Sequence, residues 1–473
     1  MRLALTLLLA TLAFGRFSIL SNEVTSPFTS PNTGYISLEQ WFPQQIDHFN
    51  DHDHRTFEQR YFMNQKFWDG YGPLLVFIGG EGTLNGPPTD ESLVGTIAKE
   101  HNGLILALEH RFYGKSIPFK NQKKPLKAKN LEFLNSRQAL ADLAHFIQDF
   151  KSKIPNGDSI PTITFGGSYP GALSAWFRLK YPHVTDASLA SSAVVNSIAN
   201  FFEFDEHIAA AVGDECAGQL RKVTALFEAK MKTKKGATEC KKVFGFDDGY
   251  RDEDIWFLLA DSQIIPTQYG QKPRLCKRLK GLDGEQLFKA YAKYAKEIFM
   301  DEYEPHGLCE YDTRCMARED YRFNQNARQW YWQSCHELGW LQSSETKNPI
   351  RSKVMTFEYW HNWCKRAYGK DRKPVNSERY INDFYGGDLP LLTNVIFTNF
   401  QDDPWKAASI RDYSNPSHDD IGPSNHRLYG TCDPDEGCSH CYDMRAAKDS
   451  DNESIKEVRN RIREILGDII NQN

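Results

Sequence analysis

The stretch that decides the fold reads Thr162-Ile163-Thr164-Phe165-Gly166-Gly167-Ser168-Tyr169-Pro170-Gly171-Ala172-Leu173-Ser174-Ala175-Trp176-Phe177. Its first residues favour a strand, and the residues after the turn favour a helix. A strand, a sharp turn and a helix in this order expose a nucleophilic hydroxyl at the turn, where small neighbours allow close backbone packing. Ser168 is therefore the candidate nucleophile. Because Pro170 replaces the usual second glycine and Gly171 follows it, an ordinary Gly-Gly-Ser turn is the alternative interpretation.

Short apolar runs on both sides of this stretch indicate further strands. They cover residues 74–78, 104–108 and 394–398, and each is followed by glycine or polar residues. Continuous apolar runs of this length are typical of strands buried on both faces of a parallel sheet. Residues 136–150 place apolar side chains at helical spacing. The alternation of strand and helix predicts an α/β fold with an α/β-hydrolase core.

The order of polar residues further along the chain agrees with that fold. An α/β-hydrolase takes its catalytic residues in the order Ser, Asp or Glu, His. The predicted strand at 394–398 leads into Asp402-Asp403, and either carboxylate satisfies the chemistry. The histidines that follow are His418, His426 and His440. Chain order alone therefore leaves the acid and the histidine open.

The sequence changes character between the two parts of the core. Residues 198–230 and 285–300 have helical patterns, and residues 455–470 form an amphipathic helix at the end of the chain. Seven of the ten cysteines lie between positions 196 and 385, which indicates a helical insertion stapled by disulfides. The predicted organisation is a signal peptide at 1–15, a first part of the core at 16–195, a helical cap insertion at 196–385 and a second part of the core at 386–473.

The N-terminus predicts export. Arg2 precedes an apolar run over residues 3–14, and small residues such as Gly15 are typical of a cleavage site. This run is shorter than the roughly 20 residues of a membrane span. We therefore expect a cleaved signal peptide and a secreted or lysosomal chain in the lumenal compartment, with a signal anchor as the alternative. Asn452-Glu453-Ser454 is then a candidate N-glycosylation site.

The cysteines agree with an oxidising compartment. All ten follow position 215, and an even number in an exported chain predicts disulfides. Cys432, Cys438, Cys441 and His440 lie at spacings that zinc ligands also use, but a second ligand pair at finger spacing is missing from the sequence. We therefore expect no metal and no cofactor.

Composition excludes several other classes. The 473 residues are 40% hydrophobic and 25% charged, unlike collagen, coiled coils or disordered chains. The 57 basic and 62 acidic residues give a net charge of −5. Because a basic excess is what drives phosphate-backbone binding, no nucleic-acid partner is expected. The composition neither predicts nor excludes the formation of a homodimer.

Several motifs resemble one known family. Residues 166–176 are similar to the nucleophile region of the serine carboxypeptidase family that contains lysosomal Pro-Xaa carboxypeptidase, dipeptidyl peptidase II and thymus-specific serine protease, with the greatest likeness to the last. Leu108-Glu109-His110-Arg111-Phe112-Tyr113-Gly114-Lys115-Ser116 resembles the most recognisable signature of that family. Further similar segments cover residues 45–49, 57–62, 134–142 and 403–405. The resemblance extends over the whole mature chain.

The resemblance implies a specific site. In this family the acid precedes Pro-Trp, which implies Asp403, and the histidine lies in a Ser-His-Cys-x-Asp-Met segment, which implies His440. An oxyanion hole is implied at the backbone N–H of Tyr169 and in the loop that contains Gly80. Phe400 stands where the family usually has glycine, so the pocket beside the acid is expected to differ.

The resemblance also implies disulfides in the cap. Cys216 would pair with Cys364 at its base, and Cys276 with Cys335. The partners of the remaining cysteines stay open: Cys240 with Cys309 or Cys315, and pairs among Cys432, Cys438 and Cys441.

The substrate is implied by the resemblance alone. Relatives prefer bonds after proline, whose fixed φ and missing N–H suit a compact apolar pocket. Candidate pocket residues are Trp330, Tyr331, Trp332 and Trp340, although cap packing explains each of them as well. Glu337 is a candidate for holding a peptide amine, or else a structural acid. The implied activity is that of a serine-type exopeptidase acting through an acyl-enzyme on peptides, and the alternatives are an esterase on this scaffold or a catalytically silent peptide-binding relative.

Overall fold

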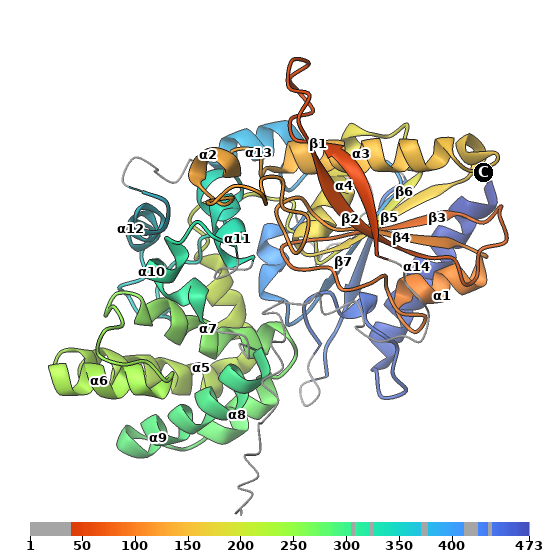
Figure 1. The fold of residues 1–473 in the computed structure, drawn as a ribbon. Helices are drawn as coiled ribbons and strands as arrows, with labels where there is room; N and C mark the ends of the chain where they lie inside the picture. The colour runs from red at the N-terminus through yellow and green to blue at the C-terminus, as the bar shows by residue number, and fades with distance from the viewer. Residues whose placement is uncertain are drawn as a thin grey trace, which may run out of the picture.

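One mixed sheet forms the centre of the protein. The computed structural model describes residues 39–303, 308–321, 326–369, 377–410, 424–433 and 438–472, so the predicted signal peptide lies outside the described residues. The sheet has eight strands in the order β1-β2-β4-β3-β5-β6-β7-β8 (Figure 1). The strands are β1 Gln40–Gln45, β2 Thr56–Asn64, β3 Leu74–Ile78, β4 Leu104–Leu108, β5 Thr162–Gly167, β6 Ala187–Ser191, β7 Val395–Phe400 and β8 His426–Gly430.

Within the sheet, β2 runs opposite to the other strands. β2 runs antiparallel to both β1 and β4, and all the other neighbours are parallel. The carboxyl ends of the parallel strands therefore meet at one edge, where loops from distant parts of the chain come together. The helices that pack on the sheet are α1 Leu93–Glu100, α3 Ser136–Ser152, α4 Tyr169–Lys180 and α14 Glu453–Gln472, and a one-turn helix, α2 Ala128–Leu131, precedes α3.

The two faces of the sheet bury separate apolar clusters. Every residue of β3 and β4 is buried. Leu74 and Val76 belong to a cluster with α3 and α4, whereas Leu75 and Phe77 pack with α1 and α14 on the opposite face (Figure 1). Successive strand side chains point to opposite faces, so burial on both sides requires an unbroken apolar run. The predicted α/β fold with an α/β-hydrolase core is confirmed.

A helical segment is inserted between β6 and β7. It lies beside the sheet rather than on either face (Figure 1). The patterns at 198–230 and 285–300 correspond to α5, which bends at Gly213, and to α9 with the π-helical turn after it. Its helices are α5 Glu203–Met231, α6 Lys234–Val243, α7 Ile255–Gln268, α8 Lys272–Leu279, α9 Gly284–Tyr294, α10 Thr313–Met316, α11 Ala327–Gln333, α12 Phe357–Tyr368 and α13 Ser377–Tyr385, with shorter turns η2 Ala295–Tyr303, η3 Cys309–Tyr311 and η4 Ser334–Leu338.

The disulfide pairing implied by the resemblance is wrong. Cys216 of α5 pairs with Cys276 of α8, and Cys335 of η4 pairs with Cys364 of α12. The same four cysteines are used, but they bond between helices that pack together, because a disulfide needs Cα atoms within about 7 Å. The other bridges are Cys309–Cys315 and Cys432–Cys438, so Cys240 does not pair with Cys309 or Cys315.

Two of the ten cysteines, whose partners the sequence left open, form no disulfide. Cys240 and Cys441 are buried free thiols. Burial raises the pKa of Cys240 to about 12, which keeps its thiol protonated.

Among the described residues, the helices lack the combination of length and apolar content that a bilayer crossing requires.

Candidate active site

Ser168 occupies the turn between β5 and α4. Its backbone has φ 65° and ψ −127°, a combination that residues other than glycine rarely adopt. Its N–H donates to the carbonyl of Ser191 at the end of β6 (2.9 Å), and its carbonyl accepts from the N–H of Ala172 (3.0 Å). A Cβ on Gly166 would lie 2.0 Å from the carbonyl oxygen of Pro170, so only glycine fits there. The strained turn with a partly exposed serine is the geometry of a nucleophile elbow.

Pro170 is compatible with this turn because it is the second residue of α4, where a backbone N–H has no partner within the helix. Its ring also packs on the loop after β3, since a Cβ on Gly80 would lie 2.5 Å from the Cγ of Pro170. Gly80 is therefore held against the turn that carries Ser168. The N–H of Tyr169 begins α4, at the positive end of the helix dipole.

Asp403 and His440 lie in direct contact, one in the loop after β7 and the other in the loop after β8. The Nδ1 of His440 lies 3.0 Å from Oδ1 and 2.9 Å from Oδ2 of Asp403, and both side chains are buried. Oδ1 of Asp403 also accepts from the backbone N–H of Trp405 (2.9 Å), which fixes the carboxylate at the start of the turn η5 (Pro404–Ala408). The Nε2 of His440 has no hydrogen-bond partner among the described residues.

The charge of Asp403 controls the pKa of His440. Burial alone lowers this pKa because it disfavours the imidazolium. The buried carboxylate of Asp403, together with a smaller contribution from Cys441, outweighs burial and raises the pKa of His440 well above its ordinary value. The imidazole is therefore a stronger base than an isolated histidine.

Ser168 and His440 come from segments that touch. A Cβ on Gly167 would lie 2.8 Å from the Sγ of Cys441. The N–H of Cys441 donates to the Oγ of Ser192 (2.9 Å), directly after the strand whose last residue accepts from the N–H of Ser168. The serine turn and the histidine loop are therefore both bound to the end of β6.

The signature after β4 contains two buried ion pairs. Glu109 is fully buried, pairs with Arg60 and accepts from the N–H of Leu84 (3.0 Å), so it anchors the loop that begins at Gly79. Arg111 pairs with Asp142 of α3. These buried pairs hold the loops around the serine turn in place.

His110, between them, contacts the residue next to Ser168. Its Nε2 lies 3.1 Å from the Oη of Tyr169, and the side-chain amide of Gln333 in the helical segment donates to the same Oη (2.9 Å). Burial lowers the pKa of His110 to about 4, so the imidazole is neutral at the pH of a cell or lysosome. This network ties the helical segment to the start of α4.

A chain of aromatic rings joins His440 to Tyr169, and we call it the aromatic arc. Its members in order are His440, Trp405, Trp340, Trp330 and Tyr169, with ring centroids 6.2, 6.3, 6.1 and 5.8 Å apart. Trp330 and Trp405 are only partly buried. The arc therefore offers apolar surface between the histidine and the residue beside the serine.

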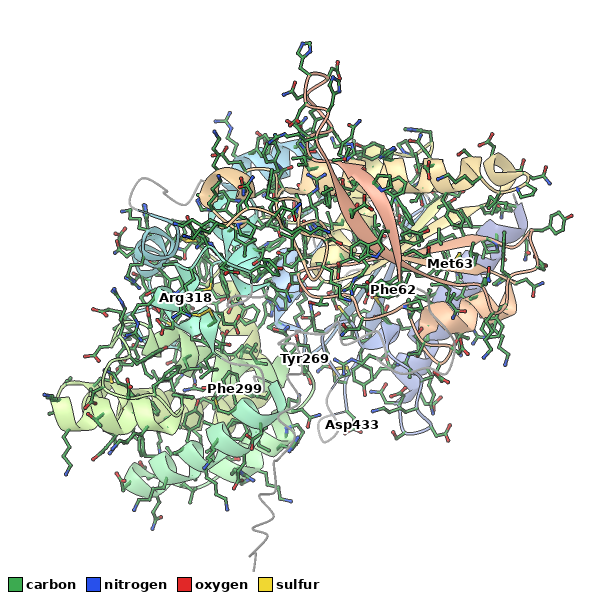
Figure 2. The ribbon with its side chains drawn as sticks, in the orientation of Figure 1. Phe62, Met63, Tyr269, Phe299, Arg318 and Asp433 are labelled. Carbon is green, nitrogen blue, oxygen red and sulfur yellow. A yellow bond between two sulfur atoms is a disulfide. The ribbon has the colours of Figure 1, made fainter. Side chains whose placement is uncertain are left out.

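The end of α7 contacts the loops that carry the acid and the histidine. The side-chain oxygen of Gln268 accepts from the indole N–H of Trp405 (2.9 Å), and its carbonyl accepts from the N–H of His440 (3.1 Å). Nearby, the Nζ of Lys272 lies 2.6 Å from Asp402. Figure 2 shows Tyr269, the residue after α7, on the side of the helical segment that faces the sheet. The helical segment therefore fixes both loops, and Asp402 is engaged away from His440.

Comparison with known proteins follows this geometry. The sequence profile of the family described as serine carboxypeptidase S28 matches residues 44–462. The chain belongs to the serine carboxypeptidase S28 family. It is 34% identical to "Probable serine protease EDA2" of Arabidopsis thaliana (95% of this chain, 92% of the relative) and 29% identical to human "Thymus-specific serine protease" (91% and 86%). It is 26% identical to mouse "Lysosomal Pro-X carboxypeptidase" (81% and 82%). This S28 chain is thus a serine-type peptidase.

Two candidate pocket residues of the S28 chain, Trp332 and Glu337, have the structural roles given as their alternative interpretations. Trp332 is buried and stacks on His336, with centroids 3.8 Å apart, so it packs within the cap and is not part of the aromatic arc. Glu337 accepts from the N–H (2.8 Å) and the Oγ (2.5 Å) of Ser136, at the first residue of α3. Its carboxylate therefore serves a helix N-terminus, as the structural interpretation expected.

Phe400 and Asn452 also have structural roles. Phe400 is fully buried in the cluster on the α14 side of the sheet, and a Cβ on Gly430 would lie 2.5 Å from its ring. Its bulk is therefore taken up by the core. Asn452 caps α14 by accepting from the N–H of Ile455 (2.9 Å), and its amide donates to the carbonyl of Thr431. Its glycosylation stays a prediction.

Sequence reasoning missed two residues near the site. Gln268 carried no signal, because a glutamine at the end of a cap helix looks like any surface residue. Glu81 lies between Gly80 and Gly82 in the expected oxyanion loop, and that position was the one available signal.

Proposed function

We propose that this S28 chain hydrolyses peptide bonds near chain ends through a triad of Ser168, His440 and Asp403. The observation that carries the proposal is the contact between His440 and Asp403 (2.9 and 3.0 Å), with Nε2 of His440 left unpartnered among the described residues beside the strained turn of Ser168. An oriented imidazole with one free nitrogen is what a general base requires.

In this mechanism the Oγ of Ser168 attacks the carbonyl carbon of the scissile bond, and its proton moves to Nε2 of His440. The tetrahedral intermediate collapses as the C–N bond breaks, and His440 returns the proton to the leaving amine. Water then hydrolyses the acyl-enzyme by the same route. Asp403 holds the imidazole and stabilises its charged form throughout.

Developing negative charge on the carbonyl oxygen needs donors. The backbone N–H groups of Tyr169 and Gly80 are proposed for this role, supported by the packing of Gly80 on Pro170 and by the start of α4. Removing one such donor typically costs on the order of a hundredfold in turnover.

The aromatic arc supports the preference for proline. Indole faces from Trp330, Trp340 and Trp405 give an apolar wall that suits a compact ring without an N–H. The four disulfides among the described residues support action in a secreted or lysosomal compartment, where such bonds persist.

Labelling with a fluorophosphonate probe tests the nucleophile. We expect modification at Ser168, and loss of both labelling and peptidase activity in Ser168→Ala, with turnover reduced roughly a millionfold. Labelling at another residue, or an active Ser168→Ala enzyme, would remove Ser168 from the mechanism. Digestion of a peptide library followed by mass spectrometry of the new ends tests the proline preference.

A further inference from the structure

Glu81 occupies a fixed position in the site, and the proposed mechanism gives its side chain no role. It directly follows Gly80, which packs on Pro170. Three residues later, Leu84 is held by the buried pair of Glu109 and Arg60: its N–H donates to Glu109 (3.0 Å) and its carbonyl accepts from Arg60 (2.7 Å). The backbone around Glu81 is therefore bound on both sides.

The carboxylate of Glu81 differs from the other acids around the site. Oε2 of Glu81 is inaccessible to solvent and has no hydrogen-bond partner among the described residues. By contrast Glu109 pairs with Arg60, Asp402 with Lys272 and Asp403 with His440. An enclosed carboxylate oxygen without a partner is costly, and a cation from a ligand would remove that cost.

Glu81 lies beside the serine turn, because the preceding residue Gly80 packs on Pro170. After burial, its charge is among the causes that raise the pKa of Tyr113 and Tyr169, and it interacts with His440. Tyr169 and His440 are the two ends of the aromatic arc. A cation paired with Glu81 therefore lies close to the bond under attack.

The position of Glu81 also indicates which half of the substrate it meets. In the proposed mechanism the leaving amine faces His440, whereas the acyl half extends from the oxyanion donors at Tyr169 and Gly80. Glu81 follows Gly80 directly, so its backbone lies beside the acyl half. The cation carried by every short acyl half of an unmodified peptide is the terminal α-ammonium, and each extended residue spans at most about 3.6 Å.

We propose that Glu81 binds the free amino terminus of the peptide substrate and directs cleavage to the amino-terminal end. This inference rests on the proposed function, because it uses the acyl-enzyme at Ser168. Glu337, the acid expected for this role from the sequence, has its carboxylate occupied by Ser136. Replacement by glutamine should therefore weaken recognition of the amino terminus at Glu81 and leave it unchanged at Glu337.

The test compares one peptide with a free and with an acetylated amino terminus. For the wild-type enzyme we expect kcat/KM to favour the free peptide by about 30-fold or more, as for other enclosed charge pairs. In Glu81→Gln this ratio should fall to near one, while kcat/KM for the acetylated peptide changes little. Glu337→Gln is the matched control and should keep the wild-type ratio.

Fluorophosphonate labelling of Ser168 in every variant separates this inference from the proposed function. Failure of wild-type labelling would overturn the mechanism itself. Normal labelling with equal free-to-acetylated ratios in wild type and Glu81→Gln would overturn the role of Glu81. So would an equal loss of activity on both peptides, because it would show that Glu81 acts on the reaction and not on the amine.

A measurement on the wild-type enzyme keeps the inference testable if Glu81→Gln does not fold. The acyl product with a free amine should inhibit the enzyme at least about 30-fold more strongly than its acetylated form. Equal inhibition by the two products contradicts the proposed pairing.

Discussion

Replacing Glu337 by glutamine should change how stability depends on pH. In the folded chain its carboxylate accepts from the N–H and Oγ of Ser136 at the start of α3. Burial raises its pKa to about 7 from the ordinary 4.5. Between these values the folded chain holds a proton on Glu337 that the unfolded chain releases.

The sign and size of the effect follow from this difference. Because the native state binds more protons, the free energy of unfolding falls as pH rises from 4.5 to about 7, and this contribution is level above that. At 1.36 kcal/mol per pKa unit the fall is at most about 3 kcal/mol, and partial exposure of the carboxylate lowers it to roughly 2 kcal/mol. Glutamine keeps an acceptor for Ser136 but has no titrating proton. Relative to wild type, Glu337→Gln should therefore gain about 2 kcal/mol of stability across this window.

Urea unfolding with intact disulfides, followed by tryptophan fluorescence between pH 4.5 and 8, measures this change. Glu464→Gln is the control, since Glu464 is 62% exposed on α14. Parallel pH profiles for wild type and Glu337→Gln would refute the argument, because they would mean that Glu337 titrates alike in the folded and unfolded chains.

The remaining predictions concern the triad, its supports and the disulfides. Asp403→Asn should lower turnover about 10⁴-fold, and, because Asp403 raises the pKa of His440, the rising limb of the pH–rate profile should move to lower pH; an unmoved limb contradicts this. Gln268→Ala should reduce kcat about 5- to 10-fold, because the hydrogen bond to Trp405 is lost. Gln268→Glu should restore kcat, since glutamate also offers an acceptor for this hydrogen bond. Equal kcat in all three enzymes would show that the contact does not position the loop. Replacing both cysteines of the Cys335–Cys364 bridge, which are 29 residues apart, with serine should cost about 3.6 kcal/mol in chemical unfolding, against about 2.2 kcal/mol for the 6-residue Cys309–Cys315 bridge; the reverse order would argue against an entropic origin.

Local patterns in the sequence were enough to locate much of the core. The apolar runs at 74–78 and 104–108 became β3 and β4, and the helical spacing at 136–150 became α3. Each pattern reflects whether a segment is buried on two faces or on one. This burial is visible in the order of apolar and polar residues within the segment itself. Boundaries inside the helical segment were less accurate, because a bend at Gly213 and a π-helical turn depend on what the helices pack against.

Pairings between distant residues were predictable only where a motif recorded them. Asp-Pro-Trp and the Ser-His-Cys segment singled out Asp403 and His440, which lie in contact. The implied disulfides were wrong, since helix packing chooses which cysteines come within bonding reach. Likewise Glu337 and Glu81 look equally suited to bind an amine in the sequence, and only their surroundings distinguish them.

By itself the sequence determined the α/β sheet, the serine at its sharp turn and the order of the acid and the histidine after it. Those features depend on short-range burial patterns and on chain order. Only the tertiary structure decided which carboxylates are satisfied, which cysteines are bridged and how α7 contacts the loops of Asp403 and His440. The physical reason is that partners are chosen by distance in space, and residues hundreds of positions apart meet only after the core has packed.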